Sequence, residues 1–96
     1  KKGEQTVVLD ISEISSLADF FVISSANNIN QLQAISDYLQ DILEKEGLEI
    51  RKVEGAKNST WILLDCSDIV IHLFTKEDRI FYNLERIWAD AKQVEL

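Results

Sequence analysis

The sequence predicts a single α/β domain, residues 1–96, in which helices pack on a mixed five-stranded sheet. Apolar runs rich in β-branched and aromatic residues recur along the chain and favour strands. Two further segments have the spacing of amphipathic helices, and the element order is β, β, α, β, β, β, α. Because two helices cannot fully cover both faces of such a sheet, we expect one apolar sheet face to stay open for a partner or a second copy of the protein.

The first half of the chain predicts two strands and a long helix. Gln5–Ile11 and Phe20–Ser25 are apolar runs separated by polar residues, and both favour strands. A helix is expected over Asn28–Glu46, where apolar residues recur at steps of three, four and one. Asn28 suits the N-cap of this helix, and Gly47 suits the left-handed residue that commonly ends one.

The second half predicts three strands and a second helix. The strands are expected at Leu48–Glu54, Thr60–Asp65 and Ile69–Phe74, with a tight turn between the last two. Thr75 can then cap a helix that continues to about Ala91. Residues 92–96 are expected to form a tail.

The last helix has a broad apolar stripe that is typical of a face packed on a core. The residues of this stripe are Ile80, Phe81, Leu84, Ile87 and Trp88. Tyr82 and Arg86 point to nearly the opposite side at 100° per residue, and Arg79 lies near them. A tyrosine beside arginines is the composition of an interaction hot spot, although a solitary surface tyrosine is an equally good interpretation.

Strand alternation separates the residues of the fourth and fifth strands into two faces. Trp61, Leu63 and Asp65 are expected on one face, with Ile62 and Leu64 on the other. The same alternation in the next strand separates His72 and Phe74 from Ile69, Ile71 and Leu73. Both faces carry apolar residues, so a binding face is a better interpretation of this hairpin than an active site.

Composition excludes several classes of protein. The net charge of −7 argues against binding to a nucleic-acid backbone and favours a basic protein partner, although it also serves solubility. No apolar run is long enough to span a membrane, and one cysteine cannot form an internal disulfide. We therefore expect a cytoplasmic protein.

The candidate catalytic residues do not form a convincing set. Cys66 and His72 lie too far apart along the expected hairpin for a nucleophile–base pair, and the chain has no metal-ligand spacing. Asp65 and Asp68 flank a turn and could hold Mg²⁺ in nucleotidyl transfer. That chemistry also needs a phosphate-holding loop, and Asp residues in turns more often bond their own backbone. A residual nucleotide-binding role for these two aspartates is the alternative function.

Four stretches of the chain carry a specific pattern in order and spacing. They are LADFFVISSANNINQLQAI, VEG, WILLDCSDIVIHLF and RIFYNLERIWADA. Over about residues 7–91, this pattern resembles the ribosomal silencing factor family, also called the Iojap family. The family turn often has glycine where Ser67 stands, and members usually have a helix before the first strand. Because this chain also lacks methionine, we expect its natural start to lie upstream.

The resemblance implies a nucleotidyltransferase-like fold that has lost catalysis and needs no cofactor or metal. It further implies binding to the large ribosomal subunit through its fourteenth protein, which blocks joining of the small subunit and represses translation. A homodimer through an overlapping surface is implied for the free protein. The contact residues that the resemblance implies here are Trp61, Leu63, Leu64, Asp65, Asp68, His72, Phe74, Tyr82 and Glu85.

Overall fold

The protein is described by a computed structural model that covers residues 4–16, 18–55 and 59–94. Its strands are β1 (Glu4–Asp10), β2 (Phe20–Ala26), β3 (Lys52–Glu54), β4 (Trp61–Asp65), β5 (Ile69–Thr75) and β6 (Lys92–Val94). Its helices are α1 (Ile29–Lys45), α2 (Lys76–Tyr82) and α3 (Leu84–Ile87). None of these helices has the length and apolar character needed to cross a bilayer, in the part of the chain that the structure describes.

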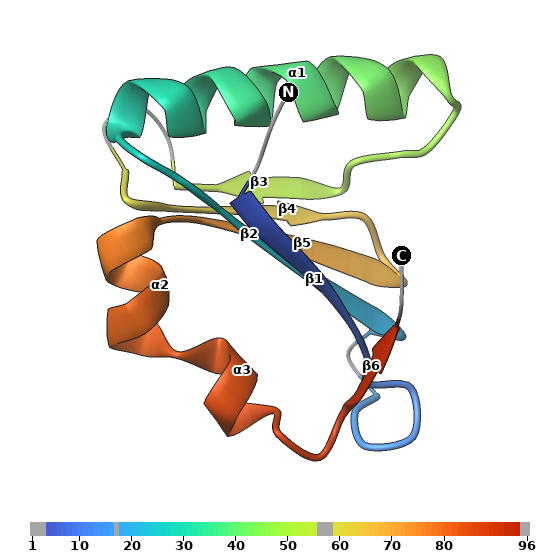
Figure 1. Cartoon of the computed structure of the whole chain (residues 1–96). Helices are drawn as coiled ribbons and strands as arrows, with labels where there is room; N and C mark the ends of the chain where they lie inside the picture. The colour runs from blue at the N-terminus through green and yellow to red at the C-terminus, as the bar shows by residue number, and fades with distance from the viewer. Residues whose placement is uncertain (1–3, 17, 56–58, 95–96) are drawn as a thin grey trace.

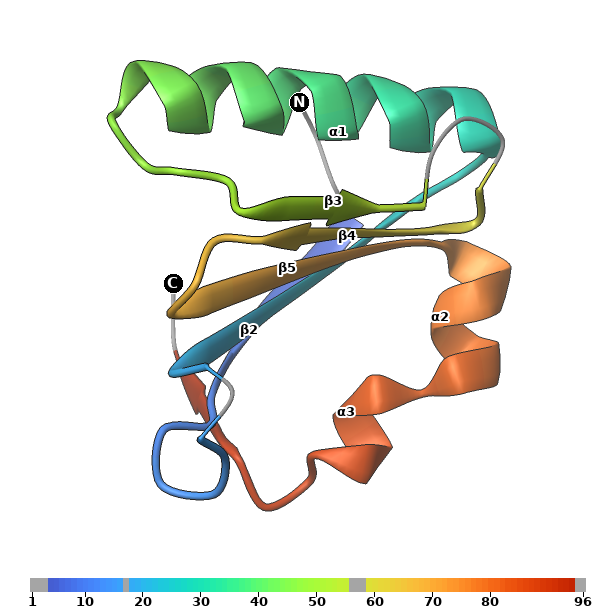
Figure 2. The same ribbon diagram turned by 180° about the vertical axis from the view of Figure 1, so that it is seen from behind.

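The strands form one six-stranded sheet in the order β3-β4-β5-β2-β1-β6. The central pair β2 and β5 is parallel, and every other neighbouring pair is antiparallel. Helix α1 lies on one face of the sheet, and α2 and α3 lie on the other (Figures 1 and 2). The predicted α/β fold class with a mixed sheet is confirmed, although the sheet has six strands and not five.

Helix α1 begins and ends at the residues that the sequence indicated. The Asn28 side chain accepts a hydrogen bond from the backbone N–H of Gln31 at 2.8 Å, which satisfies one free donor of the first turn. The Gln31 side chain returns to the N–H of Asn27, one residue before the cap, at 2.6 Å. At the other end Gly47 has φ +82°, as expected for the residue that terminates the helix.

Two apolar cores flank the sheet, and strand alternation decides which residue enters which core. The core under α1 contains Ala26, Leu32, Ile35, Ile62, Leu64, Ile71 and Leu73. The core on the second face contains Leu9, Ile11, Ala18, Phe21, Ile23 and Phe74, with Trp61, Leu84 and Trp88 packed against it. The predicted separation of Ile62 and Leu64 from Trp61 is therefore confirmed.

Strand β3 is shorter than the prediction of Leu48–Glu54. Its pairing with β4 begins at Lys52, which lies opposite Asp65. One residue before Lys52, the Arg51 N–H donates a hydrogen bond to the Asp65 carbonyl at 2.8 Å. Because β4 ends at Asp65, residues 48–51 have no strand to pair with.

The predicted single helix from Thr75 to Ala91 is wrong. Asn83 adopts φ +49° and ψ +56°, a left-handed conformation that ends α2 and starts the short helix α3. The chain then turns, and Lys92–Val94, the expected tail, pairs with β1 as β6.

The apolar stripe of the predicted helix is divided by this break. Leu84 and Trp88 pack against the second core as expected. Ile80 and Phe81 are each 78% exposed and Ile87 is 69% exposed, so these three are not core residues. Arg79, expected on the exposed side, is buried instead.

Candidate binding face around Trp61

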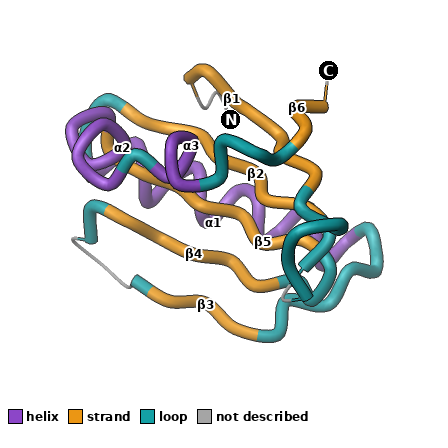
Figure 3. Tube along the Cα trace, turned by 90° about the horizontal axis from the view of Figure 1, so that it is seen from below, coloured by secondary structure: helices purple, strands orange, loops and turns teal. Residues whose placement is uncertain are grey.

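The second face of the sheet is only partly covered by helices. Seen from that side, α2 and α3 lie near β5 and β2, whereas β3 and β4 carry no helix (Figure 3). On β4 the residues of this face are Trp61, Leu63 and Asp65, all of them half-buried. The expectation of an uncovered sheet face therefore holds for the β3–β4 part of this face.

Strand pairing places β4 beside an aromatic strip on β5. Trp61 lies opposite Phe74, and Leu63 lies opposite His72. Tyr82, at the end of α2, stacks on the exposed side of this strip, with its ring centroid 4.7 Å from Trp61 and 6.1 Å from Phe74. Tyr82 is therefore not a solitary surface tyrosine.

The Trp61 face consists of Trp61, Leu63 and Asp65 from β4 and Tyr82 from α2, resting on His72 and Phe74. A hollow of about 260 Å³ on this side of the sheet is lined by Glu54, Gly55, Trp61 and Leu63. The face is thus apolar and aromatic at its centre, with the Lys52–Glu54 ion pair and the Asp65 carboxylate beside it. This is the usual composition of the centre and rim of a protein interface.

His72 supports Trp61 from beneath. Its Nδ1 accepts a hydrogen bond from the Trp61 indole N–H at 3.2 Å, and its ring meets Phe21 edge-on at 4.8 Å. The neutral ring therefore carries its proton on Nε2, which finds no acceptor among the described residues. Burial lowers the pKa of His72 from its ordinary 6.5 to about 4. The predicted histidine packed on a sheet face with one polar partner is confirmed.

This environment makes His72 sensitive to acid. The folded state disfavours protonation, because a charged ring is desolvated and can no longer accept the Trp61 N–H. Stability linked to His72 is therefore present above about pH 6.5 and is lost as the pH falls toward 4. We expect a loss of roughly 2–3 kcal/mol over that window.

Urea unfolding of the wild type and of His72→Asn at several pH values between 7.5 and 4 measures this loss. The Asn Oδ1 can still accept from Trp61 but does not titrate, and carboxylates titrate in both proteins. His72 is the only histidine of the chain, so the difference between the two curves isolates its contribution. If the free energies of unfolding of the two proteins change equally with pH, the loss does not come from His72.

The turn between β4 and β5 has a structural explanation. The Asp65 carboxylate accepts a hydrogen bond from the Ser67 N–H at 2.9 Å, as the turn interpretation predicted. Ser67 has φ +74°, which explains why glycine suits this position. Burial, followed by the nearby Asp65 charge, raises the pKa of the Cys66 thiol, so it is a poor nucleophile.

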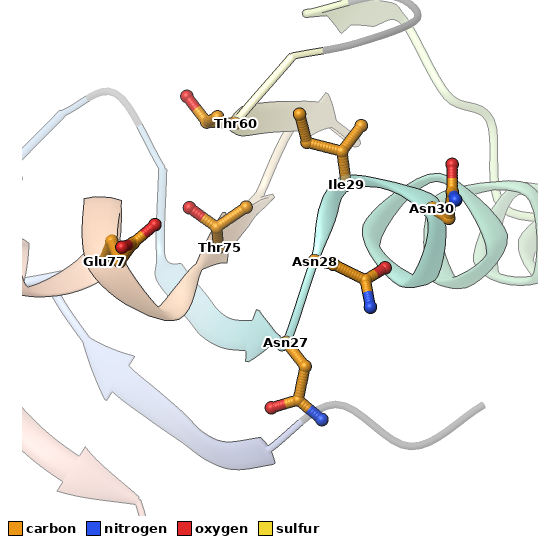
Figure 4. A pocket seen from close by; sticks show the side chains of 7 residues that line it. All are labelled: Asn27, Asn28, Ile29, Asn30, Thr60, Thr75 and Glu77. Carbon is orange, nitrogen blue, oxygen red and sulfur yellow. The ribbon is translucent and has the colours of Figure 1, made fainter.

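A pocket of about 500 Å³ lies at the opposite end of β5, where β2 and β5 end and α1 and α2 begin (Figure 4). Ligands of sheets with parallel strands often bind at such an edge. The residues that line it are Asn27, Asn28, Ile29, Asn30, Thr60, Thr75 and Glu77. Among these described residues the charged side chain is the carboxylate of Glu77, which does not suit a phosphate.

The structure separates Asp65 and Asp68 from this pocket. Strand β5 has seven residues, so its two ends lie roughly 20 Å apart. Residues 4–16, 18–55 and 59–94 contain no group of three or more possible ligands that could hold a metal ion. The geometry therefore does not favour a nucleotidyl-transfer site built on these two aspartates.

The structure brings together most of the residues that the resemblance implied. Trp61, Leu63, His72, Phe74 and Tyr82 form one continuous group on the second face. Leu64 lies in the core under α1 and is fully buried, so it supports β4 from behind. Asp68 is exposed in the turn, and Glu85 is bound to Arg79.

Two features of helices α2 and α3 were not predicted from the sequence. The first is the α2–α3 patch, which consists of the exposed side chains of Ile80, Phe81 and Ile87. The second is the buried Arg79, which was expected to be exposed near Tyr82. The one sequence signal for both is Asn83, because asparagine tolerates a left-handed backbone and can end a helix inside a periodic pattern.

The comparisons with known proteins agree on one family. The family model described as "Ribosomal silencing factor during starvation" matches residues 1–96. The chain is 45% identical over 96 residues to the ribosomal silencing factor RsfS of Halalkalibacterium halodurans, covering 100% of this chain and 82% of that protein. It is 38% identical to RsfS of Bacillus subtilis, covering 100% of this chain and 81% of that protein.

A solved structure supports the same assignment. The crystal structure of a protein from Bacillus halodurans superposes with a TM-score of 0.86 at 41% identity, covering 99% of this chain and 86% of that one. Both the sequence match and the fold match extend over nearly the whole chain. The chain therefore belongs to the ribosomal silencing factor family.

Proposed function

We propose that this protein represses translation by binding the large ribosomal subunit through its fourteenth protein. A protein seated there would occupy the surface at which the small subunit docks and would exclude it sterically. This function needs binding and no catalysis, and it places the protein in the cytoplasm with the ribosomes.

The observation that carries the proposal is the Trp61 face in a member of the ribosomal silencing factor family. Trp61 and Leu63 lie half-buried on the second face of β4, where α2 reaches Trp61 through Tyr82, and Tyr82 extends the same surface. Trp and Tyr are enriched among residues that dominate binding energy. We propose that Trp61, Leu63, Asp65 and Tyr82 contact the partner from this face. The buried His72, Phe74 and Leu64 support it from beneath, and Asp68 lies at the turn.

The charge of the protein supports a protein partner. The net charge is −7, and Asp65 lies on the same face as Trp61 and Leu63, whereas the Glu54 carboxylate is already paired with Lys52 at 3.0 Å. Such a surface attracts a basic ribosomal protein and is repelled by the phosphates of ribosomal RNA. The charge therefore favours docking to protein on a particle that consists largely of RNA.

Co-sedimentation with isolated ribosomal subunits tests the proposal. We expect the protein to pellet with large subunits and not with small subunits, and we expect saturating protein to reduce the joining of the two. Equal pelleting with both subunits, or binding to large subunits without any effect on joining, would contradict the mechanism.

We also propose that the free protein is a homodimer through a surface that overlaps the ribosome-binding face. The α2–α3 patch exposes three large apolar side chains, and Tyr82 adjoins it because Phe81 meets Tyr82 edge-on at 5.1 Å. Isolated apolar side chains are common on surfaces, but a group of this size favours an interface.

The dimer proposal is tested with Phe81→Asp and the matched control Leu48→Asp, since Leu48 is also exposed but lies after α1. In light scattering at micromolar concentration we expect a dimer for the wild type and the control, and a monomer for Phe81→Asp. A monomeric wild type, or a dimeric Phe81→Asp protein, would refute the assignment of the interface.

A further inference from the structure

We propose that Arg79 and Glu85 are positioning residues that hold Tyr82 in place on the Trp61 face. This inference rests on the proposed function for its link to ribosome binding, although the placement of Tyr82 can be tested alone. Neither residue needs to touch the partner for this role.

Arg79 is the buried cation on the helical side of the second face. It is only 8% exposed, and its guanidinium binds Glu85 through two bonds, Nε to Oε1 at 3.1 Å and Nη2 to Oε2 at 3.2 Å. Its Nη1 donates to the Ser25 hydroxyl at the end of β2 at 3.3 Å. A buried guanidinium with a fork-like pair of bonds fixes both direction and distance, which a single bond does not.

The two bonds to Glu85 span the break between the helices. Arg79 lies four residues before Asn83 and Glu85 lies two residues after it, and Asn83 carries the left-handed conformation that separates α2 from α3. The Asn83 N–H also donates to the Arg79 carbonyl at 3.0 Å. Because the ion pair joins the residues on either side of this bend, it sets the angle between the two helices.

Sheet register explains how this bend controls Tyr82. Ser25, Phe74 and Trp61 lie side by side on the neighbouring strands β2, β5 and β4. Arg79 holds one end of this row through Ser25, and Tyr82 packs on the other end through Phe74 and Trp61. Residues three apart lie on the same side of a helix, so α2 is fixed across the row at two points.

The placement of Tyr82 depends on both points. Its ring packs against Trp61 at 4.7 Å, but the residue is 41% exposed, so these contacts alone bury only part of it. If the guanidinium loses Glu85, α2 keeps its N-cap but loses the constraint at the bend, and Tyr82 becomes free to leave the face. The expected consequence is a weaker partner site in a folded protein.

The test compares Glu85→Gln and Arg79→Lys with two matched controls. Glutamine keeps the size of Glu85 and removes its charge, and lysine keeps the charge of Arg79 and removes the fork. Glu77→Gln and Arg51→Lys make the same chemical changes at exposed positions outside the Trp61 face. Urea unfolding identifies conditions under which every variant is folded.

Nuclear magnetic resonance reports the position of Tyr82 directly. Its ring protons lie beside Trp61, so ring currents shift them, whereas Tyr38 on the exposed side of α1 serves as an internal reference. In both test variants we expect the Tyr82 signals to move toward those of an exposed tyrosine and the Tyr38 signals to stay. Affinity for large ribosomal subunits should fall about tenfold, as for other residues that act through a neighbour.

The double variant Arg79→Lys/Glu85→Gln should be no weaker than either single variant, because the two side chains act as one unit. Unchanged Tyr82 signals in both single variants would overturn the positioning role. If the Tyr82 signals move but the affinity for large subunits is unchanged, the placement of Tyr82 is not important for binding. If the wild type itself does not bind large subunits, the proposed function fails, while the Tyr82 signals still decide whether Arg79 and Glu85 position the ring.

Discussion

Replacement of Trp61 with alanine is expected to weaken binding to large ribosomal subunits at least about thirtyfold, the effect of a hot-spot residue that contributes about 2 kcal/mol or more. Trp61 is the centre of the Trp61 face, since it contacts Phe74 at 4.9 Å and Tyr82 at 4.7 Å. Its indole N–H is already bound to His72, so the exposed part of the ring is free to meet an apolar partner. Co-sedimentation at a series of subunit concentrations measures the change.

The experiment needs a control for stability, because Trp61 also packs against the second core. Tyr38→Ala removes an exposed aromatic ring from α1, on the other side of the sheet, and is expected to bind like the wild type. Trp61→Phe keeps an aromatic ring but loses the bond to His72, and we expect intermediate binding. If folded Trp61→Ala protein binds as tightly as Tyr38→Ala, the Trp61 face is not the contact surface.

The parts of the fold that could be predicted are those with local signals. Helix α1 was predicted closely because Asn28, Gly47 and the apolar spacing between them lie within one stretch of sequence. The two faces of β4 were predicted for the same reason, since alternation needs only neighbouring residues. The residues of the Trp61 face that belong to β4 were therefore available from the sequence.

The segment from Arg79 to Val94 was not predictable in this way. The spacing from Ile80 to Trp88 fits one amphipathic helix, and nothing local shows that Arg79 finds Ser25, 54 residues away. The contact between Arg79 and Ser25 lies before the bend at Asn83, and the ion pair between Arg79 and Glu85 spans this bend. Strand β6 is a short polar segment that pairs with β1 from the other end of the chain, so it has no local signal either.

The aromatic contacts of Tyr82 show the same limit at the candidate site. The sequence places Tyr82 on the side of a helix, but its contact with Trp61 depends on the pairing of β4 with β5 and on the bend at Asn83. The hairpin and the bend are local features, but the packing of α2 across β5 and β4 joins separate elements. Helical spacing therefore identified Tyr82 as a candidate, and only the family resemblance grouped it with Trp61.

Gly55→Ala is expected to destabilise the fold by about 3–5 kcal/mol, whereas Gly47→Ala should cost only about 1–2 kcal/mol. The two glycines form a matched pair, because both have φ +82° and both would force a side chain into the left-handed region. A Cβ at Gly47 would meet nothing within 4 Å, but a Cβ at Gly55 would lie 2.2 Å from the Trp61 carbonyl oxygen. Urea unfolding of the two variants measures the difference.

The steric conflict at Gly55 also links the glycine of the VEG stretch to the binding face. A carbonyl oxygen of the backbone cannot rotate away as a side chain can, so alanine at Gly55 must displace the start of β4. Since Trp61 is the first residue of that strand, the part of the Gly55→Ala protein that remains folded should also bind large subunits more weakly. Equal stability of the two alanine variants would show that β4 can shift without cost, and glycine at position 55 would then be needed only for its backbone conformation.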